Sequence, residues 1–316
     1  MKKLSPKSRE LVLDSLLDFL VFLEKRFVFL LLLLVSFYYT QKSFPKEILI
    51  PRNSPATLGL LTKIPYKVKD SEFPRVTAKS VLIADLNTTR ILYQKNPDIL
   101  LAPASTTKLM TALVSLDIYP SNVLIPAPEE CSKIEGNRLA LSREENISVE
   151  DLLHAILIAS SNDAACVLAN YAVTEEDFVD LMNKKAIQLG MKNTLFTNPI
   201  GFDSYDFSHK STASDLYLLA KEARKNPIIS SIYKKPFYVL KTGNHPRSIY
   251  STNHLLTQRS GSVGMKTGTT TQAGEVFIYE FADKDKNLLI ILMGSEDRFL
   301  ETESILEWLE TNYKWL

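Results

Sequence analysis

A serine and a lysine three residues apart open the most regular helical pattern in the chain. Ser105 and Lys108 precede apolar residues that recur at helical spacing up to Asp117. Because residues i and i+3 share a helix face, the hydroxyl of Ser105 and the amine of Lys108 would lie within reach of each other. A desolvated lysine can take the proton of a serine hydroxyl, so the pair predicts a nucleophilic serine with lysine as its base.

The same serine-to-lysine spacing occurs twice more in this sequence, which is about what chance gives in a chain of this length. Ser43 and Lys46 lie in a proline-interrupted stretch, and Ser231 and Lys234 lie between a predicted helix and a turn. Neither pair opens a helix with periodic apolar residues. We therefore assign the nucleophile to Ser105.

Two further polar motifs follow along the chain. Ser160-Ser161-Asn162 lies between two predicted helices, where a hydroxyl could relay protons and an amide could hold a substrate amide. Lys266-Thr267-Gly268 lies on a predicted strand, where the cation could attract a carboxylate and the glycine would let substrate approach the backbone. We predict Ser160 as a catalytic residue, and Asn162 and the residues of the 266–268 motif as substrate-binding residues.

Both motifs have a second copy in the sequence. Lys241-Thr242-Gly243 runs into Asn244-His245-Pro246, which breaks a strand, and Ser251-Thr252-Asn253 repeats the spacing of the serine–asparagine motif. The Lys266 copy instead follows an apolar strand and precedes two more. We reject both second copies as site motifs.

Composition narrows the function further. The 37 Lys and Arg residues nearly balance the 36 Asp and Glu residues, so no basic field suggests a nucleic-acid partner. With four histidines and no CxxC spacing, the sequence offers no zinc cluster. Cys166 lies in an apolar helical stretch, where a buried free thiol is the more common outcome, and pairing with Cys131 stays open.

The N-terminus predicts export. Residues 27–39 form an uncharged apolar run behind several basic residues, and no small-x-small cleavage site follows it. We expect residues 1–26 to be cytoplasmic and residues 27–39 to be an uncleaved anchor in the plasma membrane, with a cleaved signal peptide as the alternative. Prolines interrupt residues 40–75, which predicts a linker to an extracytoplasmic catalytic domain.

Periodicity and turn residues predict an α+β domain over residues 76–316. A hairpin comes first, then a helical block, then three strands and a final helix. The expected strands are 80–84, 90–94, 262–267, 275–282 and 288–294, and the expected helices are 105–117, 149–159, 174–190, 211–225 and 299–313.

The three motifs, in this order, resemble those of the serine penicillin-recognising enzymes. Longer stretches resemble the low-molecular-mass penicillin-binding proteins that are D-alanyl-D-alanine carboxypeptidases, at residues 103–112, 160–165, 198–203, 211–215 and 266–274. The resemblance implies a β-lactamase/D,D-peptidase-like fold, with an antiparallel five-stranded sheet flanked by helices and an inserted all-helical subdomain.

The resemblance also implies a mechanism and a substrate. Ser105 would attack the carbonyl between the two D-alanines of a peptidoglycan stem peptide, with Lys108 as base and Ser160 and Lys266 sharing the proton relay. An acyl-enzyme would then be hydrolysed and D-alanine released, without a metal or cofactor. β-Lactam antibiotics would be covalent inhibitors.

Binding roles follow from the same resemblance. The backbone N–H groups of Ser105 and Thr269 would form an oxyanion hole, and Asn162 would hold the substrate amide. Thr267, with Lys266 of the same motif and Arg298 after the last strand, would bind the terminal carboxylate. A solvated surface position is the alternative for Arg298.

Three other functions share part of this pattern. A D,D-endopeptidase or weak transpeptidase differs only in the bond cut or in the acceptor. A class A β-lactamase would carry aspartate at Ser161 and a deacylating glutamate, for which Glu175 and Glu176 have the wrong surroundings. A non-enzymatic wall-binding module would have lost the nucleophile or cation motif, and both are present.

Overall fold

The computed structural model describes residues 63–316 of the 316-residue chain. The predicted cytoplasmic segment, the apolar segment 27–39 and most of the predicted linker lie outside these residues. Among residues 63–316, no helix is both long and apolar enough to cross a membrane.

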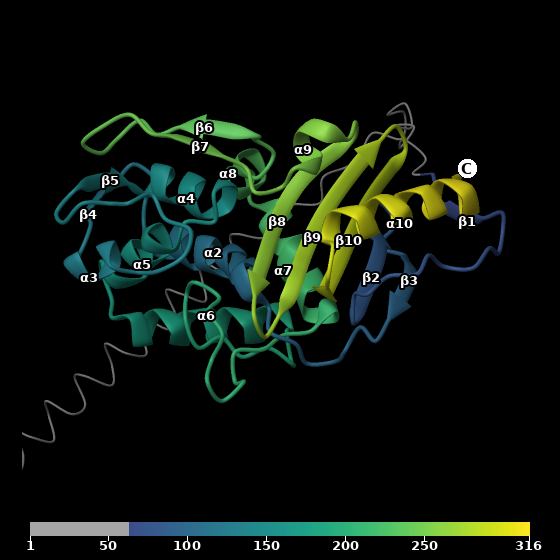
Figure 1. Cartoon of the computed structure of the whole chain (residues 1–316), viewed down its shortest axis with the longest axis horizontal. Helices are drawn as coiled ribbons and strands as arrows, with labels where there is room; N and C mark the ends of the chain where they lie inside the picture. Colours follow the sequence, from purple (N-terminus) through teal and green to yellow (C-terminus); the bar gives the residue numbers. More distant parts are fainter. Residues whose placement is uncertain (1–62) are drawn as a thin grey trace, which may run out of the picture. The chain divides into compact units, whose positions relative to one another are not determined.

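Five antiparallel strands form the central sheet, in the order β3-β2-β10-β9-β8 (Figure 1). The fold class predicted from the sequence is confirmed in this respect. Strand β8 lies at the edge of the sheet, so one side of its backbone is not used by another strand of the sheet. The strands are β2 Ser80–Asp85, β3 Ile91–Lys95, β8 Ser262–Thr270, β9 Gly274–Asp283 and β10 Lys286–Ser295.

Both faces of the sheet are covered. Successive residues of its central strands point to opposite faces and so pack into two different cores. On β9, Phe277 and Tyr279 pack with Leu306 of helix α10, Arg298–Asn312, which crosses one face (Figure 1). Ile278 instead joins the larger core that includes Leu109 and the other apolar residues of the helical region. The two cores thus lie on opposite faces of the sheet.

A mostly helical region is inserted between β3 and β8. It also contains two short antiparallel ladders, so the predicted all-helical subdomain is wrong in this detail. The helical elements are η1 Ala104–Thr107, α2 Lys108–Ile118, α3 Glu129–Ser132, α4 Val149–Ile158, α5 Asn162–Asn170, α6 Glu175–Leu189, α7 Ala213–Lys225, α8 Pro227–Ile232 and α9 Leu255–Gln258, and the ladders pair β4 Leu124–Pro126 with β5 Asn146–Ser148 and β6 Phe237–Val239 with β7 Ser248–Tyr250.

Side-chain caps begin the longer helices of this region where the sequence predicts them. The hydroxyls of Ser148 and Thr174 accept hydrogen bonds from backbone N–H groups three residues later, which satisfies free donors in the first turn of α4 and α6. Gly190 ends α6 with a φ of 80°, a left-handed conformation that glycine adopts without steric cost.

A strand also occurs before Val76, within residues that the sequence assigned to the linker. Strand β1, Pro65–Lys67, pairs with β11, Tyr313–Trp315, at the C-terminus. The ring of Phe73 stacks on Tyr93 with centroids 3.6 Å apart. Proline has no backbone N–H, but the first residue of an edge strand needs none for pairing. Pro65 is therefore compatible with a strand at this position.

The two cysteines form a disulfide, so the preference for a buried free thiol is wrong. Cys131 of α3 and Cys166 of α5 are 35 residues apart in sequence, with Cα atoms separated by 5.5 Å. Local periodicity places Cys166 correctly in a buried helix but says nothing of a partner brought in by the tertiary fold. Closing such a loop stabilises a domain by roughly 3–4 kcal/mol.

Candidate active site

Ser105 and Lys108 lie where the segment after β3 turns into helix α2. Ser105 is in the single turn η1, which begins at Ala104 with a φ of 49°, and α2 begins at Lys108. The Nζ atom of Lys108 is 2.9 Å from the Oγ atom of Ser105. Ser231, by contrast, lies within α8, where its hydroxyl donates to the carbonyl of Ile228.

Lys108 is fully buried and its amine has three oxygen neighbours. Besides Ser105 Oγ, these are Oδ1 of Asn162 at 2.9 Å and the carbonyl of Ile200 at 2.8 Å. Burial lowers the pKa of Lys108 well below its ordinary value, and the charge of Lys266 lowers it further. A neutral amine would donate its two N–H groups to the two carbonyl oxygens, which leaves its lone pair for the hydroxyl proton of Ser105.

The loop that supplies the Ile200 carbonyl is held by one side chain. Oδ1 of Asn198 accepts hydrogen bonds from the backbone N–H groups of Ile200, Gly201 and Phe202, at 3.2, 2.7 and 3.0 Å. Gly201 has a φ of 92°, and a Cβ atom there would come within 2.0 Å of the Ala104 carbonyl. The sequence analysis noted residues 198–203 only as a stretch that carries the family resemblance and assigned these residues no role.

The serine–asparagine motif joins α4 to α5 and forms one wall. Ser160 faces the pocket from a left-handed backbone conformation with a φ of 59°. Asn162, the first residue of α5, binds Lys108 and also donates through Nδ2 to the carbonyl of Glu135 at 2.7 Å. A Cβ atom on Gly136 would lie 2.6 Å from that Nδ2, so glycine lets this segment close on Asn162. Sequence reasoning missed this segment.

Strand β8 forms the opposite wall. Lys266 is buried, and its Nζ donates to the carbonyl of Thr267 at 3.0 Å. Burial, and then the charge of Arg298, lower the pKa of Lys266 to about 7. A Cβ atom on Gly268 would come within 2.8 Å of the backbone nitrogen of Ser105, so only glycine lets the strand pass this close to the nucleophile.

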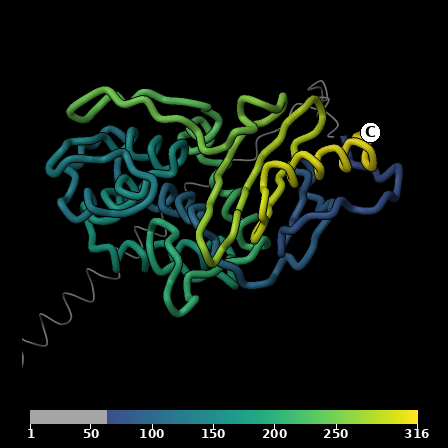
Figure 2. Tube along the Cα trace, viewed as in Figure 1, coloured from purple at the N-terminus to yellow at the C-terminus, as the bar shows by residue number. Residues whose placement is uncertain are grey.

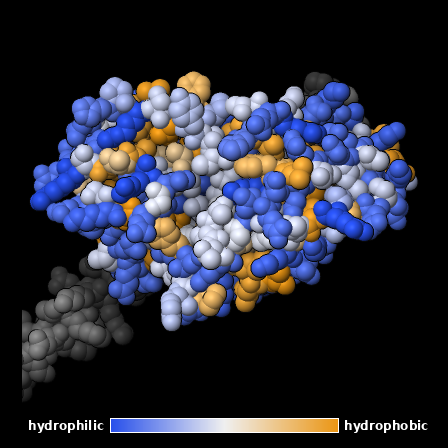
Figure 3. All heavy atoms as spheres, in the orientation of Figure 1, coloured by the Kyte–Doolittle hydropathy of each residue, from blue (hydrophilic) through white to orange (hydrophobic). Residues whose placement is uncertain are grey.

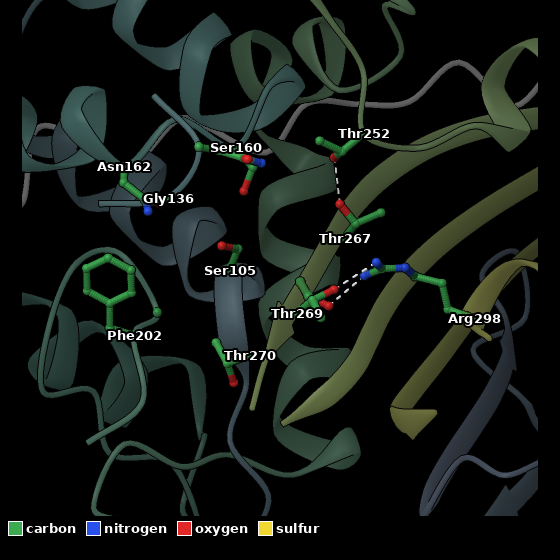
Figure 4. Close-up of a pocket in the computed structure, with 13 residues that line it drawn as sticks. Ser105, Gly136, Ser160, Asn162, Phe202, Thr252, Thr267, Thr269, Thr270 and Arg298 are labelled. Carbon is green, nitrogen blue, oxygen red and sulfur yellow. Dashed lines mark hydrogen bonds between the residues drawn. The ribbon is translucent and has the colours of Figure 1, made fainter. Parts of the chain in front are cut away.

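Arg298, the first residue of α10, reaches the same pocket. Its guanidinium donates to the carbonyl of Gly268 at 2.6 Å and to the hydroxyl of Thr269 at 2.8 Å (Figure 4). Glu275 pairs with it at 3.1 Å. The structure therefore places Arg298 at the site and not at a solvated surface position.

The two walls enclose a pocket of about 320 Å³. Lys108 and Lys266 lie behind it, buried, while the other predicted site residues line it. Thr252, from a motif that we rejected, also lines it, with its hydroxyl 2.6 Å from that of Thr267 (Figure 4). The lining residues are Ser105, Gly136, Asn137, Ser160, Asn162, Gly201, Phe202, Thr252, Thr267, Gly268, Thr269, Thr270 and Arg298.

Residues 67–297 match the sequence model of the D-alanyl-D-alanine carboxypeptidase family, Peptidase_S11. The chain belongs to this family. It is similar to a D-alanyl-D-alanine endopeptidase of Pseudomonas aeruginosa, at 34% identity over 241 residues that cover 73% of this chain and 77% of the relative. It is also similar to a D-alanyl-D-alanine carboxypeptidase of Mycobacterium tuberculosis, at 31% identity over 220 residues, covering 70% and 76%.

Solved structures of the carboxypeptidase family have the same fold. A D-alanyl-D-alanine carboxypeptidase from Mycobacterium tuberculosis superposes with a TM-score of 0.72 at 28% identity, covering 78% of this chain and 95% of that chain. The Streptomyces K15 DD-transpeptidase superposes with a TM-score of 0.72 at 25% identity, covering 76% and 100%. The family and fold predicted from the motifs are confirmed.

Proposed function

We propose that this chain is a serine D-Ala-D-Ala carboxypeptidase that removes the terminal D-alanine of peptidoglycan stem peptides. The observation that carries the proposal is the 2.9 Å contact between Ser105 Oγ and the buried amine of Lys108, at the floor of a pocket walled by an open strand edge. A serine hydroxyl beside a desolvated amine is a pair suited to acyl transfer.

The proton would pass from Ser105 to Lys108 as Oγ attacks the carbonyl between the two D-alanines. The same proton would then reach the leaving amine of D-alanine, with Ser160 on the pocket wall as the relay. Water would hydrolyse the resulting ester of Ser105 with Lys108 again as base. The lowered pKa of Lys108 supports this role, because a general base must be unprotonated at the working pH.

The substrate would lie along the free edge of β8. The backbone N–H groups of Ser105 and Thr269 would stabilise the oxyanion, a contribution of about 3 kcal/mol per donor. The terminal carboxylate would bind near Thr267, with Lys266 and Arg298 supplying positive charge. The close approach of Gly268 to Ser105 supports this placement, since it brings the strand edge beside the nucleophile.

A β-lactam would enter the same pocket and acylate Ser105. We expect intact-mass spectrometry after incubation with penicillin to show one covalent adduct, mapped by peptide fragmentation to Ser105 and lost in Ser105→Ala. An adduct on Ser231 or Ser43, or none, would contradict the assignment. Rapid turnover of the adduct would favour a β-lactamase, although Glu175 and Glu176 do not line the pocket.

Release of D-alanine from a D-Ala-D-Ala peptide tests the activity itself. The endopeptidase alternative rests on the relative from Pseudomonas aeruginosa, which carries that name. A cross-linked wall peptide offered beside the linear peptide separates the two: preferential loss of the linear peptide supports the carboxypeptidase. Preferential cleavage of the cross-link would replace it with the endopeptidase.

We also propose that residues 27–39 anchor the enzyme in the plasma membrane with the catalytic domain outside. The apolar run and its basic flank support this orientation. A reporter fused after Leu316 should be active only on the outer side of the membrane. A secreted form that begins near residue 40 would refute the anchor and keep the export.

A further inference from the structure

A second hollow lies beside the active-site pocket and has no part in the mechanism above. It measures about 310 Å³ and is formed by the segment that joins β3 to η1 and by the loop between α6 and α7. An antiparallel bridge between Leu101 and Ser211 holds these two segments together, and both run along the lower edge in Figure 2. Figure 3 shows hydrophobic side chains gathered along that edge.

One side chain links the linings of the two hollows. A single carboxylate, that of Asp203, accepts hydrogen bonds from the hydroxyl of Thr270 and from the backbone N–H of Gln272 at 2.9 Å. Thr270 lines the active-site pocket, and Gln272 lines the second hollow. Ala102, another lining residue, is three positions before Ser105. Thr270 of the first lining and Gln272 of the second are thus two positions apart and bonded to the same carboxylate.

The loop presents an apolar ring to solvent from a fixed backbone. Phe207 lines the hollow, is 68% exposed and has a φ of 57°, a left-handed conformation that is unfavourable for a large side chain. Ser204 fixes the loop on both sides, because its hydroxyl accepts from His209 N at 2.8 Å and its carbonyl accepts from Gln272 Nε2 at 2.9 Å. An exposed aromatic ring held in this way is prearranged for contact with a ligand.

The hollow also contains a positive charge. Lys210 lines it and forms no ion pair with any carboxylate in residues 63–316. No aspartate or glutamate of that part of the chain lines the hollow. Its charge and its apolar walls therefore suit a ligand that combines a carboxylate with apolar surface.

The positive charges at one end of the active-site pocket set the direction in which a peptide would bind. Lys266 and Arg298 would hold the C-terminal carboxylate, so the rest of the peptide must leave at the other end of the pocket, past Phe202 and Thr270. We propose that the second hollow binds the part of an acidic wall peptide upstream of D-Ala-D-Ala, with Lys210 pairing with its carboxylate and Phe207 packing on its apolar part. This inference rests on the proposed carboxypeptidase function.

Steady-state kinetics on three peptides ending in D-Ala-D-Ala test the subsite. One is a short acylated peptide with no upstream residue, one carries upstream glutamate, and one carries glutamine at the same position. For Lys210→Gln, we expect the KM of the glutamate peptide to rise about fivefold, the equivalent of roughly 1 kcal/mol for a lost ion pair. Its kcat, and both constants for the other two peptides, should match the wild type.

Phe207→Ala should raise the KM of both long peptides and leave the short peptide unchanged. Matched controls are Lys234→Gln and Phe237→Ala, which remove an exposed lysine and an exposed phenylalanine that line neither hollow. Equal effects on the short and long peptides, or no effect of Lys210→Gln on the glutamate peptide, would overturn the subsite while the proposed activity stands. Failure of the wild type to cleave the short peptide would overturn the activity and the subsite with it.

Discussion

The chain contains the tripeptide Lys-Thr-Gly twice, and the two copies lie in different structural surroundings. The copy at 266–268 lies in the middle of the edge strand β8, buried against η1. The copy at 241–243 follows β6 in the loop of the β6–β7 hairpin, where Lys241 is exposed and pairs with Glu150 at 3.3 Å. The same three residues thus occur at the candidate active-site pocket and at a surface turn.

A carboxylate explains the difference between them. Asp151 of α4 accepts hydrogen bonds from the backbone N–H groups of Lys241 and Thr242, at 2.9 and 2.7 Å, and from the Thr242 hydroxyl at 2.6 Å. These three hydrogen-bond donors of the hairpin copy are therefore already bound by a carboxylate of the protein. The copy on β8 keeps one backbone edge and the Thr267 hydroxyl facing the pocket, where a substrate carboxylate would take the place that Asp151 has in the hairpin.

Replacing each lysine should give the largest contrast. Lys266→Ala should lower kcat/KM for D-alanine release by about 10²- to 10⁴-fold, the range for losing a group that acts in proton transfer. Stability should change less, because burial already disfavours the charged form of this lysine. Lys241→Ala should be nearly silent in both, since exposed ion pairs contribute little. D-alanine release and thermal melting measure both effects, and the opposite ranking would refute the site.

The glycines should separate geometry from stability. A Cβ atom on Gly268 would lie 2.8 Å from Ser105 N and 2.9 Å from Ala104 Cβ, so Gly268→Ala should displace the nucleophile and slow penicillin acylation by about 10²-fold, as for loss of an oxyanion donor. Gly243→Ala should keep acylation. It should instead lower stability by about 1 to 3 kcal/mol, because Gly243 has a φ of 97°. Slow acylation in both variants would contradict the comparison.

The pH dependence of stability should report the burial of Lys266 in the pocket copy. The pKa of Lys266 is about 7 in the folded state, below the ordinary 10.5. Between these values the unfolded chain binds the proton and the folded chain does not, so this lysine makes stability rise with pH and fall as pH approaches 7. Lys266→Met should reduce the slope by about 1.4 kcal/mol per pH unit in this window. Urea unfolding from pH 7 to 10 measures the slope, and an unchanged slope in Lys266→Met would contradict the buried environment of this lysine.

Sequence patterns could predict the elements and the motifs because these depend on local periodicity and order. The five strands of the central sheet, the caps at Ser148 and Thr174, and the preference for Ser105 over Ser231 all follow from neighbours within a few residues. The strand argument also predicted that only the Lys266 copy lies on a strand of the central sheet, since Pro246 is incompatible with a continuing central strand.

What the sequence could not give depends on distant pairings. The Cys131–Cys166 bond, the pairing of β1 with β11 and the Ile200 carbonyl beside Lys108 each join segments far apart in the chain. We rejected the motif that contains Thr252 as a second copy of the serine–asparagine motif, yet the fold brings the hydroxyl of Thr252 to that of Thr267. No local pattern indicates which of several polar residues will meet across a pocket.

The threonines should give the smallest and most specific contrast. In the hairpin, the Thr242 hydroxyl bonds to Asp151 and accepts from the backbone N–H of Ser148 at 2.9 Å. Thr242→Val would leave the Ser148 N–H without its acceptor and remove one of the donors to Asp151, so it should lower the free energy of unfolding by about 1 to 2 kcal/mol, with D-alanine release unchanged.

Thr267→Val should behave in the opposite way. Its hydroxyl meets only that of Thr252 among the hydrogen bonds of the described residues, so stability should change by less than about 1 kcal/mol, while KM for the D-Ala-D-Ala peptide rises as a carboxylate partner is lost. Urea unfolding and steady-state kinetics on both variants give a crossed pattern if the pocket copy binds substrate and the hairpin copy binds Asp151. If Thr267→Val instead destabilises the fold as Thr242→Val does and leaves KM unchanged, the pocket threonine is structural and the carboxylate must bind elsewhere.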